Sequence, residues 1–312
     1  MKKLLIIDGN AIVHRAYHAY PPVLTDPEGQ IINAVYGFFS MLVKVIEEVK
    51  PDYLIICFDR PAPTFRKLLY AGYQAQRPKM GDDLSGQIKR LHQALEVIGI
   101  PVFEVDGYEA DDCIGTLSVQ AQQQKEKIET VILSGDRDLL QLVNEQTKEL
   151  MPITGITKFN LFDIQKVIEK FGITPSQIVD YKALVGDASD GYPGVGGIGP
   201  KTAVNLLTKY KTFENIYTHI AEITGTTAEK LAKDAESGAL SKQLATIALD
   251  APVHLDLQKA SMQNFAREKV LQVCDMFGFN SIRKRLDVFP AASAVNIKKS
   301  SKEPHKDQLE LI

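Results

Sequence analysis

Short apolar runs alternate with helical patterns over the first part of the chain, and this alternation constrains the fold more than any other feature. Strands separated by helices at this spacing predict βαβ units and an α/β fold with a mostly parallel sheet flanked by helices. The apolar runs cover residues 4–7, 53–58, 102–105 and 130–133. The helical patterns between them cover residues 31–49, 88–98 and 109–123.

Acidic residues stand just after these predicted strands. Asp8, Asp59 and Asp136 each follow a strand directly, and Glu109 comes four residues after the third strand. Parallel strands end at one edge of a sheet, where ligands collect. We therefore expect the acids to converge there. The full candidate set is Asp8, Asp59, Glu109, Asp111, Asp112, Asp136, Asp138, Asp187 and Asp190.

The densest part of this set is Gly107-Tyr108-Glu109-Ala110-Asp111-Asp112. Taken alone, it is typical of an acidic first helical turn, since a helix N-terminus favours anions. The recurrence of acids elsewhere favours a different interpretation. Carboxylates without histidine or cysteine suit Mg²⁺ or Mn²⁺. Two such ions, about 4 Å apart, can activate water and stabilise the leaving oxygen of a phosphodiester.

Composition restricts the cellular setting and the class of site. Three scattered cysteines without a CxxC pair argue against a disulfide framework or a zinc–thiolate site. No apolar run reaches the length of a membrane span. We expect a cytoplasmic protein without a membrane partner. The net charge of −3 gives no hint of nucleic-acid binding, so any such evidence has to be local.

A basic and aromatic segment lies between residues 60 and 90. Arg66, Tyr70, Tyr73 and Arg77 fall at helical spacing, which predicts one helix face carrying all four. Arginines on such a face bind phosphates and tyrosines stack on unpaired bases. The alternative is an ordinary amphipathic helix with half-buried tyrosines.

A glycine-rich turn leads into a helix near residue 200. Its glycines let the backbone approach a phosphate, and Pro200 fits a helix start. A Rossmann fingerprint fails because no strand precedes the turn, and a P-loop fails because Gly-Lys-Ser/Thr is missing. The candidate phosphate-binding residues are Gly194, Gly196, Gly197, Gly199, Lys201 and Thr202.

The chain changes character after about residue 155. Apart from a possible short strand at 158–162, residues 156–287 are predicted to be mainly helical. Residues 288–312 are polar and lysine-rich without periodicity, which predicts a disordered tail. The predicted domains are therefore 1–155, 156–287 and a tail.

Several motifs together resemble the 5′ nuclease (flap endonuclease) superfamily, and most closely the 5′–3′ exonuclease domain of bacterial DNA polymerase I. The resemblance covers residues 2–287. It implies a PIN-like sheet, a helical arch at about 60–90 and a helix–hairpin–helix-like element at about 180–211. The motifs are Ile7-Asp8-Gly9-Asn10, Val35-Tyr36-Gly37-Phe38, Phe58-Asp59, Gly107 to Asp112, Gly135-Asp136-Arg137-Asp138-Leu139 and Gly186-Asp187-Ala188-Ser189-Asp190.

The resemblance also implies roles for individual residues. Asp8, Asp59, Glu109 and Asp111 would hold the ion nearer the attacking water. Asp136, Asp138, Asp187 and Asp190 would hold or orient the second, with Asp112 shared or behind them. Arg15, Tyr73 and Arg77 would act near the scissile phosphate, with Arg66, Tyr70 and Lys79 on the DNA. The helix–hairpin–helix-like element could also bind K⁺.

One residue departs from the family pattern, which has lysine after the arch tyrosine. Here Gln74 follows Tyr73, so a cation at the scissile phosphate is missing unless Lys67 or Lys79 replaces it. This substitution affects the expected rate of cleavage more than the class of reaction.

The predicted function is a metal-dependent 5′–3′ exonuclease or flap endonuclease acting on DNA and RNA primers in replication and repair. Its substrate would be branched or nicked DNA with a 5′ single strand. The alternatives are a PIN-like ribonuclease and a catalytically weak DNA-junction binder. We expect either a free-standing nuclease or a piece of a longer chain. Gln308-Leu309-Glu310-Leu311-Ile312 resembles a sliding-clamp docking peptide, against the alternative of an inert tail.

Overall fold

The computed structural model describes residues 1–77, 80–155 and 158–291. Its centre is a six-stranded sheet with the order β3-β2-β1-β4-β5-β6. All neighbouring strands are parallel except the β5–β6 pair. The strands are β1 (Lys2–Asp8), β2 (Tyr53–Cys57), β3 (Val102–Phe103), β4 (Ile128–Leu133), β5 (Thr147–Thr154) and β6 (Lys158–Phe162).

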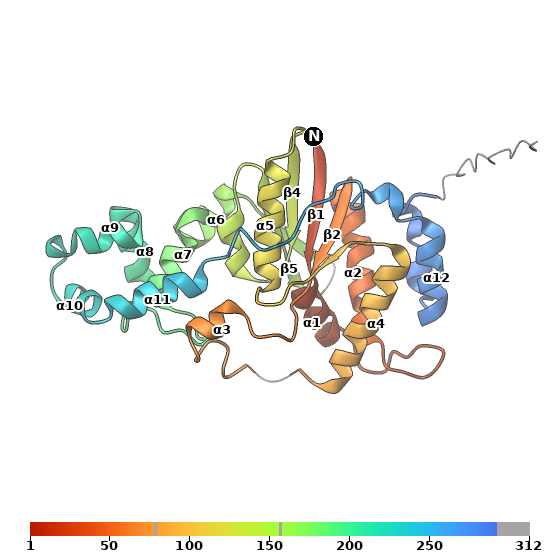
Figure 1. Cartoon of the computed structure of the whole chain (residues 1–312), viewed down its shortest axis with the longest axis horizontal. Coiled ribbons are helices and arrows are strands. Elements are labelled where there is room, and N and C mark those ends of the chain that lie inside the picture. Colours follow the sequence, from red (N-terminus) through yellow and green to blue (C-terminus); the bar gives the residue numbers. More distant parts are fainter. Residues whose placement is uncertain (78–79, 156–157, 292–312) are drawn as a thin grey trace, which may run out of the picture.

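Helices cover both faces of the sheet and form most of the second half of the chain (Figure 1). The α-helices are α1 (Gly9–Ala19), α2 (Asn33–Val49), α3 (Phe65–Leu69), α4 (Asp82–Ile98), α5 (Ala110–Gln122), α6 (Ile164–Phe171), α7 (Ile178–Val185), α8 (Pro200–Tyr210), α9 (Phe213–Thr218), α10 (Thr226–Lys233), α11 (Ala235–Ala245), α12 (Arg267–Phe277) and α13 (Asn280–Arg283). The 3₁₀ helices are η1 (Arg137–Leu142), η2 (Pro175–Gln177), η3 (Ile220–Glu222), η4 (Met262–Asn264) and η5 (Leu286–Val288).

Strand β1 is buried on both faces, and its alternating side chains divide two cores. Leu5 and Ile7 pack into the core formed with α1, α2 and α4. Leu4 and Ile6 pack into the core on the other face, under α5. Successive strand residues point to opposite faces, so a continuous apolar run is needed in a strand covered on both sides. The predicted α/β fold class is confirmed.

The strand order reverses direction at β1, which places a topological switch point at the carboxyl end of β1. The chain runs outward from β1 through β2 to β3 and then returns to the other side of β1 with β4. In such sheets the crevice at the switch point is the usual ligand site. Asp8, the last residue of β1, therefore lies at this crevice.

Helix α1 begins directly after Asp8. The Asp8 carboxylate caps the helix by accepting a hydrogen bond from the Ala11 backbone N–H at 3.0 Å. A Cβ on Gly9 would lie 2.5 Å from the Phe58 ring, so only glycine fits between strand and helix here. This close packing brings the ends of β1 and β2 together.

The helical region lies at one end of the long axis of the molecule, with α8, α9 and α10 farthest from the sheet (Figure 1). Its core is continuous with the sheet through Phe162 of β6 and Leu140 of η1. At the opposite end, α12 and the segment around it return to the sheet. Phe265, Phe277 and Phe289 belong to the core of α2 and α4. The short strand expected at 158–162 is confirmed as β6, and it extends the sheet past the predicted boundary at 155.

The single long helix predicted through residues 66–77 is wrong. Helix α3 ends at Leu69, and Tyr70 is extended, with φ −144° and ψ 111°. Gly72 packs against the Tyr70 ring, and Gln74 has the left-handed φ of 51°. The chain therefore turns instead of continuing as a helix, and the predicted common face does not form.

Strand β5 was not predicted from the sequence. Within the part of the chain that the structure describes, no helix combines the length and apolarity needed to cross a bilayer. Of the predicted disordered tail, 288–312, residues 292–312 lie outside the described residues. Its start is corrected, because Val288 ends η5 and Phe289 is buried in the core.

Candidate metal centre

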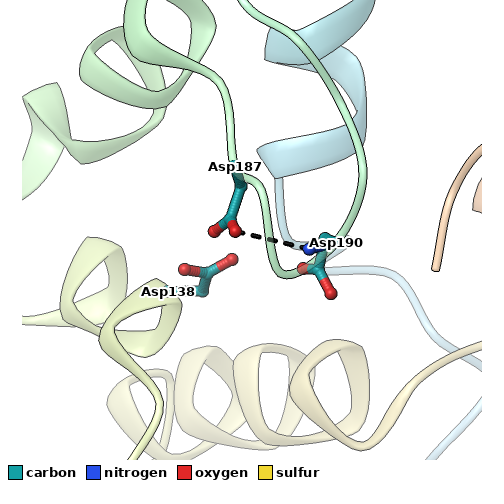
Figure 2. A group of neighbouring side chains, drawn as sticks. All are labelled: Asp138, Asp187 and Asp190. Carbon is teal, nitrogen blue, oxygen red and sulfur yellow. Dashed lines mark hydrogen bonds between the residues drawn. The ribbon is translucent and has the colours of Figure 1, made fainter. Parts of the chain in front are cut away.

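Three aspartates from two separate elements form a compact acidic group (Figure 2). Asp138 lies on η1, and Asp187 and Asp190 lie in the turn after α7. One carboxylate oxygen from each residue lies within 4.8 Å of the others, close enough to share a metal ion. This geometry, with oxygen donors only, fits a hard divalent cation.

The turn that carries Asp187 and Asp190 is held by its own hydrogen bonds. Asp187 and Tyr192 pair across it through backbone bonds of 2.8 and 3.1 Å. The Asp187 carboxylate accepts the backbone N–H groups of Ser189 at 2.8 Å and Asp190 at 3.3 Å. A tight hairpin turn therefore brings the two acids together.

A lysine enters this acidic group. The Lys182 ammonium donates to Asp138 and, at 2.7 Å, to Asp187. Burial is the largest single influence on Asp187 and opposes its ionisation, but the hydrogen bonds from Lys182 and Ser189 and the Lys182 charge together lower the pKa of that carboxyl to about 2. For Asp138, burial followed by the Asp136 charge raises the pKa to about 7. Lys182 was not among the site residues predicted from the sequence, although it lies in the helix directly before Asp187.

A second acidic group gathers around Asp111 in the first turn of α5. Burial, and then the charges of Asp136 and Asp8, raise the pKa of Asp111 well above its usual value. Burial also raises the pKa of Asp8 to about 7, although the Ser134 hydroxyl donates to it at 2.6 Å. These shifts have one cause: carboxylates from four parts of the chain lie together away from water.

Asp59 and Glu109 border this group on the β2 side. The Asp59 carboxylate accepts the Ala110 backbone N–H at 2.7 Å, and burial raises the pKa of Asp59. Burial raises the pKa of Glu109 to about 7, against the opposing charge of Arg66. The structure thus brings together eight of the nine predicted acids. Their individual roles as metal ligands remain predictions.

Asp112 is the acid that points away from this group. It is fully buried and accepts two hydrogen bonds of 2.8 Å from the Arg66 guanidinium. Its remaining bonds come from the backbone N–H groups of Glu109 at 2.9 Å and Ala248 at 2.8 Å. With both oxygens committed, Asp112 has no free oxygen for an ion, so the expectation of a shared ligand is corrected to a supporting position.

The expectation that Arg66 contacts DNA is also corrected. Its side chain is 3% exposed, and it donates to Asp112, to Glu109 at 3.1 Å and to the carbonyls of Leu244 and Thr246. Burial disfavours the charged guanidinium, but the Asp112 hydrogen bonds and the Glu109 charge raise the pKa of Arg66. Arg66 therefore joins α3, α5 and the end of α11 in the interior.

Tyr73 is buried as well, with 3% of its surface exposed. Its hydroxyl donates to Glu109 at 3.1 Å, and its ring faces that of Tyr192. Tyr70 packs against the hydrophobic cluster that contains Tyr73 and Tyr192. The alternative of tyrosines turned inward therefore fits better than base stacking, and Tyr73 touches the site through Glu109.

Two arginines of the predicted set remain at the surface of the site. Arg77 is exposed, and its charge acts on Asp59, where it opposes the rise in pKa caused by burial. The Arg15 guanidinium donates through Nε to the Gly155 carbonyl at 2.8 Å. Lys79 lies outside the described residues.

The glycine-rich turn joins α7 to α8 as a helix–hairpin–helix-like element. Gly194 is buried, and a Cβ there would lie 2.3 Å from the Gly186 nitrogen. Its N–H donates to the Ser241 hydroxyl at 3.0 Å, and the Gly196 N–H donates to Asp234 at 2.9 Å. These two N–H groups are thus taken by the protein, so their expected phosphate contacts are corrected. Gly197, Gly199, Lys201 and Thr202 stay at or near the surface.

Two protein-family models match this chain and show the family to which it belongs. The model of the 5′–3′ exonuclease N-terminal resolvase-like domain matches residues 3–172, and that of the 5′–3′ exonuclease C-terminal SAM fold matches residues 173–268. The chain belongs to the 5′–3′ exonuclease family. The resemblance drawn from the motifs is thereby confirmed.

Curated relatives agree with this affiliation. A 5′–3′ exonuclease of Aquifex aeolicus is 38% identical over 94% of this chain and 98% of its own. DNA polymerase I of Bacillus subtilis is 39% identical over 91% of this chain. The match covers only 32% of that polymerase, so this chain spans about a third of the length of the polymerase relatives.

Solved structures share the fold at low sequence identity. The T5 D15 protein co-crystallised with metal ions has a TM-score of 0.63 at 17% identity, covering 92% of this chain and 99% of that one. The catalytic core of Rad2 in complex with DNA substrate has a TM-score of 0.55 at 14% identity, covering 92% and 91%. The PIN-like sheet with a helical C-terminal region is therefore confirmed.

The Arg66–Asp112 pair generates a stability prediction. Arg66→Met leaves Asp112 buried without its partner, so we expect a loss of about 3–5 kcal/mol in the free energy of unfolding. Arg66→Met combined with Asp112→Leu should recover most of this loss, because neither charge of the pair is then left in the interior. Chemical denaturation in EDTA measures both variants.

The exposed Arg283–Asp275 pair provides the control. Arg283→Met should cost less than about 1 kcal/mol, as is usual for surface ion pairs. Additive losses in the Arg66 and Asp112 variants, without recovery in the double variant, would show that the buried pair is not the source of the effect.

Proposed function

We propose that this chain hydrolyses phosphodiester bonds near the junction of a 5′ single strand with a duplex, as a 5′–3′ exonuclease and flap endonuclease. The observation that carries the proposal is the convergence of eight carboxylates at the switch point of the sheet, beside the segment between α3 and α4. Asp138, Asp187 and Asp190 meet within 4.8 Å there, and the buried group around Asp111 adjoins them. Family membership supports the same reaction.

The residues of the site would have separate roles in binding the ions, positioning their ligands and binding the substrate phosphates. Asp8, Asp59, Glu109 and Asp111 would hold one divalent ion, Mg²⁺ or Mn²⁺, and Asp136, Asp138, Asp187 and Asp190 would hold a second. When bound, such ions supply an activated water and charge stabilisation for the leaving oxygen. Tyr73 and Arg66 hold the Glu109 carboxylate through hydrogen bonds of 3.1 Å. Arg77 and Arg15 would bind phosphates next to the scissile bond.

The duplex would bind along the helix–hairpin–helix-like element. Helix α8 begins after Gly199 without a side-chain cap, and Lys201 is exposed in its first turn. Free N–H groups and a cation at a helix start bind a phosphate without reading sequence. K⁺ would be a further ion at this element. Nicked or branched DNA and RNA primers in replication and repair are the proposed substrates, and the cytoplasm is the proposed location.

Flap cleavage tests this function. Asp111→Asn should reduce single-turnover cleavage of 5′-flap DNA about 10²–10³-fold or more, because it removes a charge from the middle of the site. Binding of the same flap in Ca²⁺ should persist. The matched control is Asp106→Asn, an exposed neighbour paired with Arg60, which should cut like the wild type.

The two alternative functions predict different results in the same cleavage assay. A PIN-like ribonuclease would cut single-stranded RNA in preference to the flap. A junction-binding protein would bind the flap but cut nothing with Mg²⁺, in wild type and variant alike. Either result would overturn the proposed activity.

Gln74 yields a second prediction. Its amide donates to Asp190 at 3.1 Å, so the residue at the family's lysine position lies against the acidic group. Gln74→Lys should place a cation there and raise single-turnover cleavage about tenfold, equivalent to about 1.4 kcal/mol. Gln76→Lys, two residues on and exposed, should leave the rate unchanged. Equal rates for both variants and wild type would mean that Arg77 already supplies the needed charge.

A sliding clamp is proposed as a further partner from Gln308 to Ile312, which lie outside the described residues. A pull-down on immobilised clamp should retain the full chain and lose a 1–290 truncation. Equal retention of the two would exclude docking through this peptide.

A further inference from the structure

Glu149 of β5 is a buried carboxylate that takes no part in the site described above. Its side chain is fully buried, and neither carboxylate oxygen has a hydrogen-bond partner among the described residues. Burying an unpartnered carboxyl group is costly, because the interior offers neither water nor a donor in exchange. Such a destabilising group in the sheet suggests a partner that the described part of the chain does not provide.

The sheet register shows where this carboxylate faces. Glu149 pairs with Ile132 of β4, which pairs in turn with Ile6 of β1. Side chains in register on adjacent strands share a face, and Ile6 and Ile132 pack under α5. Asp8, two residues after Ile6, points to that same face. Glu149 therefore lies on the face of Asp8, set back from the sheet edge.

The acids of η1 lie near this position. Helix η1 packs on β5, and it carries Asp138 directly after Asp136 and Arg137. Burial first, and then the charges of Asp136, Asp8 and Asp138, raise the pKa of Glu149 well above its usual value. The neighbouring Lys148 does not offset these charges, since its ammonium pairs with Glu129 at 3.3 Å. The charges that act on Glu149 thus come from acids of the candidate metal centre.

We propose that Glu149 is an inner acid of the metal centre, which positions the divalent ion near Asp136 and Asp138 by accepting hydrogen bonds from its water ligands. Mg²⁺ and Mn²⁺ keep several waters when bound by a few carboxylates, and these waters are strong donors. Acceptors behind the ligands commonly change metal affinity 10–100-fold. The inference rests on the proposed metal-dependent function and adds to it a residue that touches the ion's waters only.

Mn²⁺ binding to the full chain without DNA tests this role, followed by calorimetry or electron paramagnetic resonance. Glu149→Gln should weaken Mn²⁺ affinity at least tenfold and leave the ion-free unfolding temperature unchanged or higher. Glu149→Met should also weaken Mn²⁺ binding while raising the ion-free unfolding temperature, because an apolar side chain replaces a buried acid. A residue with a purely structural role would not show a higher ion-free unfolding temperature together with weaker Mn²⁺ binding.

Glu129→Gln is the matched control, a β4 glutamate paired with Lys148, and it should bind Mn²⁺ like the wild type. Wild-type affinity in both Glu149 variants would overturn the inference and leave the proposed function standing. A fall in ion-free stability in both Glu149 variants would assign Glu149 a structural role and overturn it too. No Mn²⁺ binding by the wild type would instead remove the proposed function together with this inference.

Discussion

Repulsion among carboxylates at one sheet edge is the constraint on which the rest of this structure depends. Eight acids meet there, and burial raises the pKa of Asp8, Glu109 and Asp138 to about 7. Such a site lowers stability unless positive charge is supplied. The fold supplies part of it through one lysine and one arginine side chain that reach the acids from neighbouring helices, and the proposed divalent ions would supply the remainder.

Arg66 and Lys182 have different consequences, although each pairs with two acids. Arg66 is buried with Asp112 and also bonds the carbonyls at the end of α11, so it fixes α3, α5 and α11 relative to one another. Its geometry is bidentate and leaves Asp112 no free oxygen. Lys182 is more exposed, at 12%, and shares Asp138 and Asp187 with the candidate ion position. Arg66 is therefore part of the fold, whereas Lys182 occupies a position at which an ion would compete with it for Asp138 and Asp187.

The sequence predicted the parallel sheet and the convergence of acids because both follow from local rules. Continuous apolar runs mark strands covered on both faces, and acids after such strands must lie at one edge. The helix through residues 66–77 failed because periodicity ignores packing. Gly72 against the Tyr70 ring and the left-handed Gln74 turn the chain there. Arg66 and Asp112 were misassigned for a related reason, since a charged residue next to a site is indistinguishable in sequence from one inside the interior. Strand β5 was missed because Lys148 and Glu149 interrupt its apolar pattern.

The interior position of Arg66 changes how the segment between α3 and α4 relates to chemistry. Tyr73 and Arg66 both end on the Glu109 carboxylate, and the Gln74 backbone N–H donates to the Asp190 carbonyl at 2.8 Å. One short stretch thus contacts an acid of each proposed ion position. The side chains of this one stretch therefore contact both carboxylates, Glu109 through Tyr73 and Arg66 and Asp190 through Gln74. Coupling of this kind requires no long pathway, since the contacts are direct. It ties the placement of the acids to the conformation of residues 65–77, and so makes the geometry of the metal centre depend on the segment that covers it.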